Sequence, residues 1–242
     1  INVPVYLGPI SEWLIIKPLY LYIITAMPVL ELISLSLLIL IFSLIQSLFG
    51  VGLLLFGTPT LLLLGYSYDT LLWILLPSSV IISLSQIHRN SHLIQTQKSL
   101  YIATLPPLIL GLFLVITNED HIDITKIVGG TLITIGLLRQ FNKLEKLLKY
   151  VLKKNPSLFY FLLGGIHGFS NMGGGPLTAL MSSIHENKKS IQANIAQVYL
   201  IFALSQLIIL SLTSLNSLEY SYLLFIIIPL IGYNLIGKNL SK

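Results

Sequence analysis

Long stretches without a charged residue constrain the fold of this chain more than any other feature. They are residues 32–68, 70–88, 99–118, 127–138, 155–185, 190–218 and 220–237. A bilayer core about 30 Å thick is crossed by roughly 20 helical residues, and most of these stretches reach that length. They are apolar on all faces, which suits lipid better than the surface of a soluble domain. The sequence therefore predicts an all-α, polytopic membrane protein with about seven to nine membrane segments.

Composition supports the membrane prediction and excludes other classes. Of the 242 residues, 55% are apolar and only 10% are charged, whereas soluble domains carry about 25% charged residues. The chain has no cysteine, which excludes disulfides, thiolate metal sites and cysteine nucleophiles. The net charge of +5 comes from basic residues in the loops between apolar stretches, where such residues report membrane topology. We therefore expect the lipid bilayer, and no nucleic acid, as a partner.

Two of the charge-free stretches are too long for one span and contain glycine and proline. Gly50, Gly52, Gly57 and Pro59 interrupt the first. The second, residues 155–185, is interrupted by Gly164, Gly165, Gly168, Gly173, Gly174, Gly175 and Pro176. Breaks of this kind within a membrane are typical of discontinuous helices and re-entrant hairpins. We predict that each broken segment is a hairpin that returns to the side from which it entered.

The charges of the loops alternate and give a topology. Loops 88–98, 139–154 and 182–189 are basic, and loops 118–126 and 214–222 are acidic. With two returning hairpins, every basic loop falls on the cytoplasmic side, as the positive-inside rule requires. If each broken segment instead crossed once, Lys188 and Lys189 would lie outside. The sequence thus predicts a multi-pass protein of the cytoplasmic membrane with its basic loops inside.

We expect a single membrane domain over residues 1–242, built from two repeats. The expected parts are a first repeat at 29–141, a basic amphipathic connector lying on the membrane surface at 142–156, and a second repeat at 157–242. Residues 1–28 are expected to be an extra or non-native segment, because the chain begins with Ile1 and a methionine follows at Met27.

A weak internal repeat relates the two broken segments. Pro59 and Pro176 lie 117 residues apart, and the same spacing pairs Gly57 with Gly174. Ser85-Gln86 and Ser205-Gln206 lie 120 residues apart, which implies a three-residue insertion in the second hairpin. One hairpin and three spans in the first half make an odd number of crossings, so the second half begins from the opposite side. The sequence therefore predicts an inverted repeat, which is common among transporters.

Two motifs resemble those of a known family, the TauE/SafE sulfite exporters. GGIHGFSNMGGGPLTAL at 164–180, followed by the stretch ending ANIAQVYLIFALSQL at 193–207, resembles the second-half motif of that family. LFGVGLLLFGTPTLLLLG at 48–65 resembles its first-half motif, with Phe56 where glycine is frequent. The resemblance extends over most of residues 28–240. It implies a carrier that exports sulfite or a related small organosulfur anion, with the two breaks meeting near mid-membrane. The family has one more span after the segment at 220–237, so the resemblance also implies a truncated second repeat.

The residues themselves favour an anion or a neutral solute as substrate. No catalytic motif occurs, and we expect no enzyme activity, no cofactor and no metal. Cation pathways through membranes generally use buried carboxylates, and the apolar stretches contain none. The N-terminus of a broken helix presents backbone N–H groups that hold anions, and three glycines allow close approach to that backbone. Pro176 suits the first turn of such a helix, where its missing N–H costs little.

These arguments give a set of candidate residues. The predicted substrate-binding residues are Gly173, Gly174, Gly175, Asn171, Gly57, Thr58 and Gln46. His167 is the candidate for carrying a coupled proton, and a neutral histidine bonded to the backbone is the alternative. Secondary polar candidates are Gln86, Gln206, Asn194 and Gln197, although polar side chains in spans often only bond a neighbouring helix. Gly164 and Gly168 have the spacing of close helix packing.

The competing hypothesis is a membrane protein that does not transport, either a scaffold or a truncated member of the family. The absent final span favours this alternative, and the charge-free breaks favour the carrier.

Overall fold

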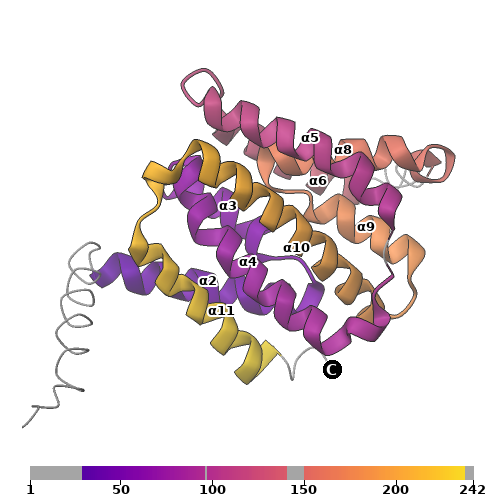
Figure 1. The fold of residues 1–242 in the computed structure, drawn as a ribbon, viewed down its shortest axis with the longest axis horizontal. Helices are drawn as coiled ribbons and strands as arrows, with labels where there is room; N and C mark the ends of the chain where they lie inside the picture. The colour runs from indigo at the N-terminus through magenta and orange to yellow at the C-terminus, as the bar shows by residue number, and fades with distance from the viewer. Residues whose placement is uncertain (1–28, 96, 141–149, 238–242) are drawn as a thin grey trace, which may run out of the picture.

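The structure is a computed structural model that describes residues 29–95, 97–140 and 150–237, and these ranges are entirely helical apart from short turns. The elements are α2 (Val29–Phe49), α3 (Leu53–Leu63), α4 (Tyr68–Asn90), η1 (Ser91–Leu93), α5 (Lys98–Thr117), α6 (Ile124–Gln140), α8 (Pro156–Ser170), α9 (Gly174–Ile184), α10 (Lys188–Thr213), η2 (Leu215–Ser217), η3 (Tyr220–Ile226), α11 (Ile227–Gly232) and the π-helical turn η4 (Tyr233–Gly237), as Figure 1 shows. The predicted extra segment 1–28, residue 141 of the predicted first repeat and residues 142–149 of the predicted connector lie outside the described residues.

The helices have the length and composition of membrane spans. Within the described ranges, four segments are long and apolar enough to cross a membrane: Val29–Phe49, Tyr68–Leu93, Lys98–Thr117 and Lys188–Thr213. Shorter apolar helices cover Leu53–Leu63, Ile124–Leu137 and Ser221–Leu235. Large apolar side chains are exposed on the outside of the bundle, for example Ile102 at 75% and Leu212 at 78%. These observations confirm the prediction of an all-helical chain with several spans.

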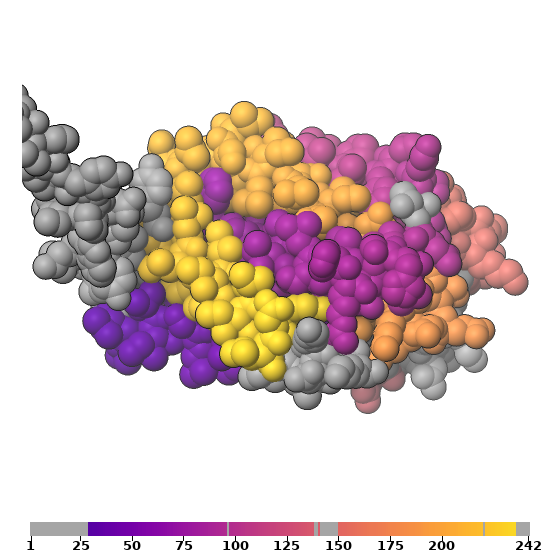
Figure 2. Space-filling model, turned by 60° about the horizontal axis from the view of Figure 1, so that its bottom comes forward, coloured from indigo at the N-terminus to yellow at the C-terminus, as the bar shows by residue number. Residues whose placement is uncertain are grey.

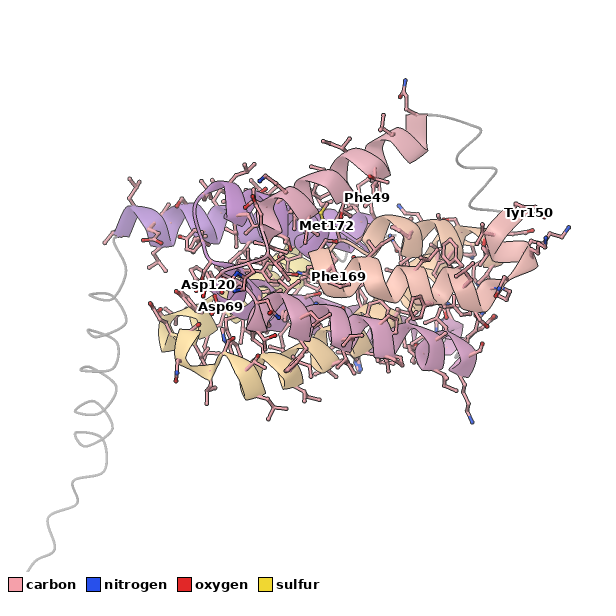
Figure 3. All side chains as sticks on the ribbon, turned by 90° about the horizontal axis from the view of Figure 1, so that it is seen from above. Phe49, Asp69, Asp120, Tyr150, Phe169 and Met172 are labelled. Atoms are coloured by element: carbon pink, nitrogen blue, oxygen red, sulfur yellow. The ribbon has the colours of Figure 1, made fainter. Side chains whose placement is uncertain are left out.

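Acidic residues gather at one end of the bundle. Ser217 donates a hydrogen bond to Asp69, and Tyr66 donates one to Glu31. Burial and the neighbouring Asp69 carboxylate raise the pKa of Glu119. Figure 3 places Asp69 and Asp120 together at this end of the bundle, far from Tyr150. We call this the acidic end.

The opposite end carries the basic residues and is tied together by side-chain amides. Asn194, near the start of α10, accepts a hydrogen bond from Gln95 N (2.8 Å) and donates one to Leu93 O (3.0 Å). Tyr160 of α8 donates to Gln97 (3.2 Å). The basic residues that end or begin helices there are Arg89, Lys98, Lys153, Lys154, Lys188 and Lys189. We call this the basic end.

Glycines allow α5 and α8 to pack with their backbones in contact. A Cβ on Gly164 or Gly168 would lie closer than 3.0 Å to the carbonyl oxygens of Thr104 and Leu108, respectively. Real Cβ atoms do not approach that closely, and a helix backbone cannot yield as a side-chain tip can. The predicted close packing at these two positions is therefore confirmed, since their glycines touch the backbone of α5.

Gly164→Ala is expected to lower the free energy of unfolding by about 1–3 kcal/mol or more, because the added methyl group overpacks a contact between two backbones. The matched control is Gly165→Ala, the next residue in α8, where an added Cβ meets no atom within 4 Å. Thermal unfolding of the detergent-purified proteins measures both. Equal melting temperatures for the two variants would contradict this account of the α5–α8 contact.

Both predicted breaks are present, and each separates a longer helix from one of 11 residues. α2 ends at Phe49 and α3 begins at Leu53, while α8 ends at Ser170 and α9 begins at Gly174. Each break contains a residue with a left-handed backbone, Gly50 (φ 79°) and Asn171 (φ 58°). At 1.5 Å per residue, the 11-residue helices α3 and α9 are about 16 Å long, roughly half the thickness of a bilayer core. The chain runs in opposite directions through the two breaks (Figure 1).

The helix boundaries correct the register of the repeat. The starts of α3 and α9, their ends, and the left-handed residues Gly50 and Asn171 all lie 121 residues apart. The starts of α4 and α10 lie 120 apart. The spacing of 117 taken from Pro59 and Pro176 is therefore wrong by about one helical turn, and no three-residue insertion is needed. Pro59 lies in the middle of α3, whereas Pro176 lies in the first turn of α9.

Candidate functional site

Each break is held by a polar side chain from the last turn of the helix that precedes it. Gln46 of α2 accepts a hydrogen bond from Leu53 N, the first residue of α3, through Oε1 (3.2 Å). His167 of α8 accepts one from Gly173 N, just before α9, through Nδ1 (3.2 Å). Gln46 and His167 lie 121 residues apart, in the corrected register, and both are fully buried. The two side chains thus occupy equivalent positions, and each accepts a hydrogen bond from the backbone at the end of its break.

The backbone donors fix how these side chains are oriented. A backbone N–H can only donate, so Gln46 presents its carbonyl oxygen to Leu53 and its Nε2 amide group elsewhere. By the same reasoning, His167 Nδ1 carries no proton, and Nε2 is the protonated nitrogen of the neutral ring. His167 Nε2 lies 3.2 Å from Gln206 Oε1. This oxygen accepts the hydrogen bond from the protonated Nε2, which leaves Gln206 Nε2 as a second amide donor.

Helix α4 adds a glutamine to the first break, and helix α10 adds one to the second. Gln86 of α4 donates through Nε2 to the backbone oxygen of Gln46 (3.2 Å), while Gln206 of α10 bonds to His167. The two glutamines lie 120 residues apart, as do the starts of their helices. The predicted pairing of Gln86 with Gln206 is consistent with the structure, although that of Gly57 with Gly174 is not.

The two breaks also contact each other. Asn171 donates through Nδ2 to Thr58 Oγ1 of α3 (2.9 Å), which joins residues 113 positions apart. Tyr199 of α10 points its hydroxyl at Gly174, the first residue of α9, and a Cβ on Gly174 would lie 3.3 Å from Val51 of the first break. We call this group the central polar cluster: Gln46, Thr58, Gln86, His167, Asn171, Tyr199 and Gln206. Figure 3 shows Phe169, in the last turn of α8, and Met172, in the second break, near the middle of the bundle.

Several polar atoms of the cluster have no hydrogen-bond partner. The unpartnered donors are Gln46 Nε2, Gln206 Nε2 and the Tyr199 hydroxyl, and the unpartnered acceptors are Gln86 Oε1 and Asn171 Oδ1. The side chains of the cluster are at most 3% exposed. Leaving a buried donor unpaired costs about 1–3 kcal/mol, so three such donors in the side chains around the two breaks are unusual for a purely structural network. In addition, the first N–H groups of α9 have no partner within the helix.

The other predicted site residues lie outside the central polar cluster. Gly57 packs in α3 against Leu75 of α4, and Gly175 against Ile135 of α6. Asn194 makes three hydrogen bonds at the basic end. Gln197 lies half-buried beside Gln95 and Gln97. Gly173 adjoins the cluster, because a Cβ on it would collide with the His167 ring.

Tyr199 was not predicted as a site residue, and its spacing offers the signal that would have found it. It precedes Gln206 by seven residues, two helical turns, and therefore shares a face of α10 with it. Ser79 precedes Gln86 by the same seven residues on α4, and its buried hydroxyl is also unpartnered. A hydroxyl and a glutamine thus recur at i and i+7 in both long helices.

An apolar cavity of about 600 Å³ lies beside the first break. Its walls come from α2, α3, α6 and α9, and include Phe49, Val51, Leu132 and Thr178. Val51 therefore stands between this cavity and Gly174. Within the described ranges, no three His, Asp or Glu side chains gather where a metal ion could bind.

A helical bundle with several apolar spans defines an integral membrane protein. The sequence matches the family model described as Sulfite exporter TauE/SafE over residues 35–242. The chain belongs to this family, which confirms the resemblance seen in the two motifs. It is a family of transporters rather than enzymes, whose members are associated with small anions. No curated protein and no solved structure matches the chain.

Proposed function

We propose that this protein is a secondary transporter that exports a small anion, sulfite or a related organosulfur anion, through the central polar cluster. The observation that carries the proposal is the set of buried donors without partners beside the two breaks: Gln46 Nε2 at the first, and Gln206 Nε2 and the Tyr199 hydroxyl at the second. Family membership supports an anionic substrate. Only the family membership supports the proposal that the anion contains sulfur.

The chemistry of the cluster suits an oxyanion. An anion needs donors, and hydrogen bonds to a charged acceptor are about twice as strong as neutral ones. The orientation of Gln46 and Gln206 leaves both amide groups free to donate, and the N-terminus of α9 adds backbone N–H groups and a favourable helix dipole. With His167 neutral, no charged side chain is present in the cluster, so binding in that state relies on neutral donors.

The paired architecture supports alternating access. In the proposed inverted repeat, α2, α3 and α4 correspond to α8, α9 and α10, and the cluster lies where the two sets meet. Transporters of this kind expose a fixed site alternately by moving one repeat against the other. The cluster is sealed from both ends in this conformation, since its side chains are buried. The apolar cavity beside Val51 gives the first break room to move.

The experiment that tests this function is uptake into proteoliposomes of sulfite, thiosulfate, sulfoacetate, sulfate and acetate. The proposal predicts saturable flux of at least one sulfur anion. A non-transporting scaffold is the competing candidate, and it predicts only the leak seen in protein-free vesicles. Well-inserted protein that moves none of the five anions would favour the scaffold.

We propose that the basic end faces the cytoplasm. The positive-inside rule supports this orientation, and the absence of native cysteine makes a direct test simple. In intact cells, a membrane-impermeant maleimide is expected to label Asp120→Cys at the acidic end and to leave Lys154→Cys at the basic end unlabelled until the cells are opened. The reverse pattern would invert the orientation, and labelling of both would contradict the bundle as a membrane domain.

His167 is the proposed carrier of a coupled proton. A proton arriving on Nδ1 would break the bond to Gly173 N, so protonation and the geometry of the second break are linked. Glutamine performs the same task at Gln46, and His167→Gln is therefore expected to fold and to remain inserted. Its transport rate is expected to lose the pH dependence of the wild type between about pH 5 and pH 8. An unchanged pH profile would remove His167 from the coupling.

A further inference from the structure

A second cavity lies on the outer face of the bundle, away from the central polar cluster. It has a volume of about 600 Å³ and lies between the last turns of α4 and the segment formed by α11 and η4. Its walls are Ile81, Leu84, Ser85, His88, Arg89, Leu230, Tyr233 and Asn234. Figure 2 shows α4 and α11 side by side on this face of the molecule. Leu84 is 45% exposed and Leu230 is 42% exposed, so the cavity opens toward the surroundings of the bundle.

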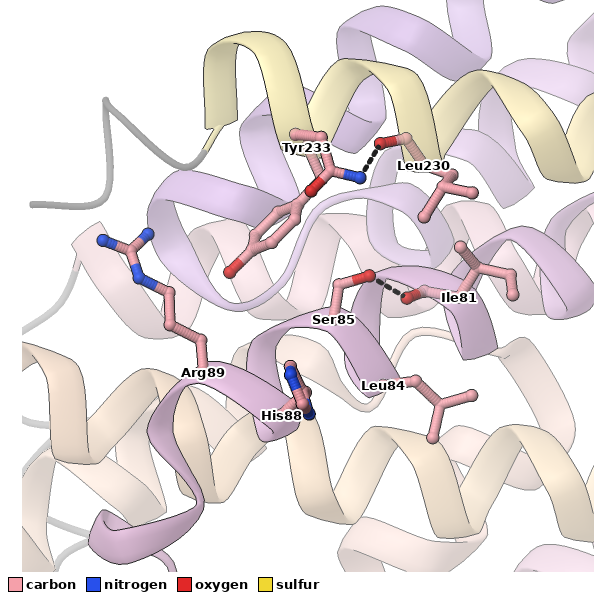
Figure 4. Close-up of a pocket in the computed structure, with 8 residues that line it drawn as sticks. Ile81, Leu84, Ser85, His88, Arg89, Leu230 and Tyr233 are labelled. Carbon is pink, nitrogen blue, oxygen red and sulfur yellow. Dashed lines mark hydrogen bonds between the residues drawn. The ribbon is translucent and has the colours of Figure 1, made fainter.

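Both walls of this cavity change from apolar to polar in the same direction. Along α4, Ile81 and Leu84 come first, and His88 and Arg89 follow one to two turns nearer the basic end. Along the opposite wall, Leu230 precedes Tyr233 and Asn234. Figure 4 shows Ile81, Leu84 and Leu230 at one end of the cavity and Arg89, His88 and the Tyr233 hydroxyl at the other.

This gradient matches the amphiphilic shape of a membrane lipid. In a bilayer, the apolar end of the cavity would lie within the acyl chains and the polar end at the headgroups. A guanidinium binds phosphate through two parallel hydrogen bonds, and tyrosine is typical of membrane interfaces.

Ser85 and Asn234 retain hydrogen-bonding capacity for a ligand. Ser85 donates to Ile81 O of its own helix (2.8 Å), and Asn234 donates once to Leu230 O (3.0 Å). These bonds leave the Ser85 oxygen as an acceptor, and the second N–H and the amide oxygen of Asn234. Gln86, on the same helix, points into the bundle and is only 3% exposed. The two sites on α4 are therefore on different faces of the helix.

We propose that this cavity binds an anionic phospholipid, with its phosphate on Arg89, His88 and Tyr233 and one acyl chain against Ile81, Leu84 and Leu230. The proposal does not depend on the proposed transport function, since it requires only that the chain lies in a membrane. The ligand is a lipid and not a free anion, because Ile81, Leu84 and Leu230 form an apolar end of the cavity that would lie against an acyl chain.

The test is the thermal stability of the detergent-purified full chain with added phosphatidylglycerol or phosphatidylcholine of the same acyl chains. Phosphatidylglycerol is expected to raise the melting temperature at lower concentration than phosphatidylcholine.

Arg89→Gln is expected to weaken the phosphatidylglycerol effect about five- to tenfold, measured against the variant's own lipid-free melting temperature. Lys98→Gln, which removes one charge at the same end outside the cavity, is the matched control and is expected to change nothing. Ser85→Phe fills the cavity without changing its charge and is expected to weaken both lipids.

Three results would overturn the proposal. Equal effects of the two lipids would exclude a headgroup site. Equal weakening by Arg89→Gln and Lys98→Gln would indicate diffuse attraction to a basic surface. Stabilisation by inorganic phosphate or glycerol phosphate at the same concentration as by phosphatidylglycerol would indicate a free-anion site.

Discussion

Gly174→Leu is expected to abolish anion transport while the protein remains inserted in the membrane. A Cβ on Gly174 would collide with the Tyr199 hydroxyl and press on Val51 of the first break, so a leucine side chain would fill the space where the two breaks meet. It would also block access to the N–H groups of α9. The measurement is the initial rate of uptake of the transported sulfur anion into proteoliposomes, normalised to inserted protein.

Two variants separate a blocked site from a misfolded protein. Gly165→Leu in the same hairpin has open space around its Cβ, and it is expected to transport like the wild type. Gly174→Ala combined with Tyr199→Phe removes the closest collision and is expected to restore the melting temperature but not the flux, because the hydroxyl donor is lost. Normal transport by Gly174→Leu would refute the placement of the site at α9.

Tyr199→Phe is expected to raise the KM for the transported anion about 10- to 100-fold, since a hydrogen bond to a charged group contributes about 1.5–3 kcal/mol. The hydroxyl has no partner within the protein, so its removal relieves an unpaired buried group. The melting temperature is therefore expected to stay the same or to rise. A raised KM together with an unchanged or higher melting temperature would indicate that the hydroxyl binds the substrate and does not stabilise the fold.

The matched control is Tyr68→Phe. The Tyr68 hydroxyl is also buried and unpartnered, but it lies at the start of α4, near the acidic end. This variant is expected to gain or keep stability with an unchanged KM. If both tyrosine variants shifted the KM equally, the effect would not come from the central polar cluster.

The sequence predicted the architecture well because the relevant signals are local. Charge-free stretches mark spans, and glycine-rich runs mark breaks, whatever the rest of the chain does. The packing role of Gly164 and Gly168 followed from their spacing alone. The register of the repeat could not be predicted from spacing alone, because Pro59 and Pro176 are the same residue type at different helical positions. Proline is tolerated in the first turn of α9 and inside α3, so it is an unreliable marker of equivalence.

The candidate site was only partly predictable, because depth in the membrane and facing direction are tertiary properties. Asn171 and Thr58 come together as the glycine-rich breaks suggested, and Gln46 bonds to the start of α3. Gly57, in contrast, faces a leucine of α4. Tyrosines in a membrane protein usually indicate interfacial anchors, and the contact with Gly174 shows that Tyr199 is not one of those. The donor roles of Gln46 and Gln206 depend on which atom each backbone or ring N–H engages, which composition and spacing do not encode.

Counterflow in proteoliposomes loaded with an unlabelled sulfur anion tests whether the central polar cluster is the site of an anion carrier. A carrier with an alternately exposed site is expected to accumulate labelled anion transiently against its concentration gradient, with the accumulation lost in Gly174→Leu and shifted to higher concentration in Tyr199→Phe. Accumulation that is identical in the wild type and both variants, or no counterflow from well-inserted wild-type protein, would contradict an anion carrier built on the central polar cluster.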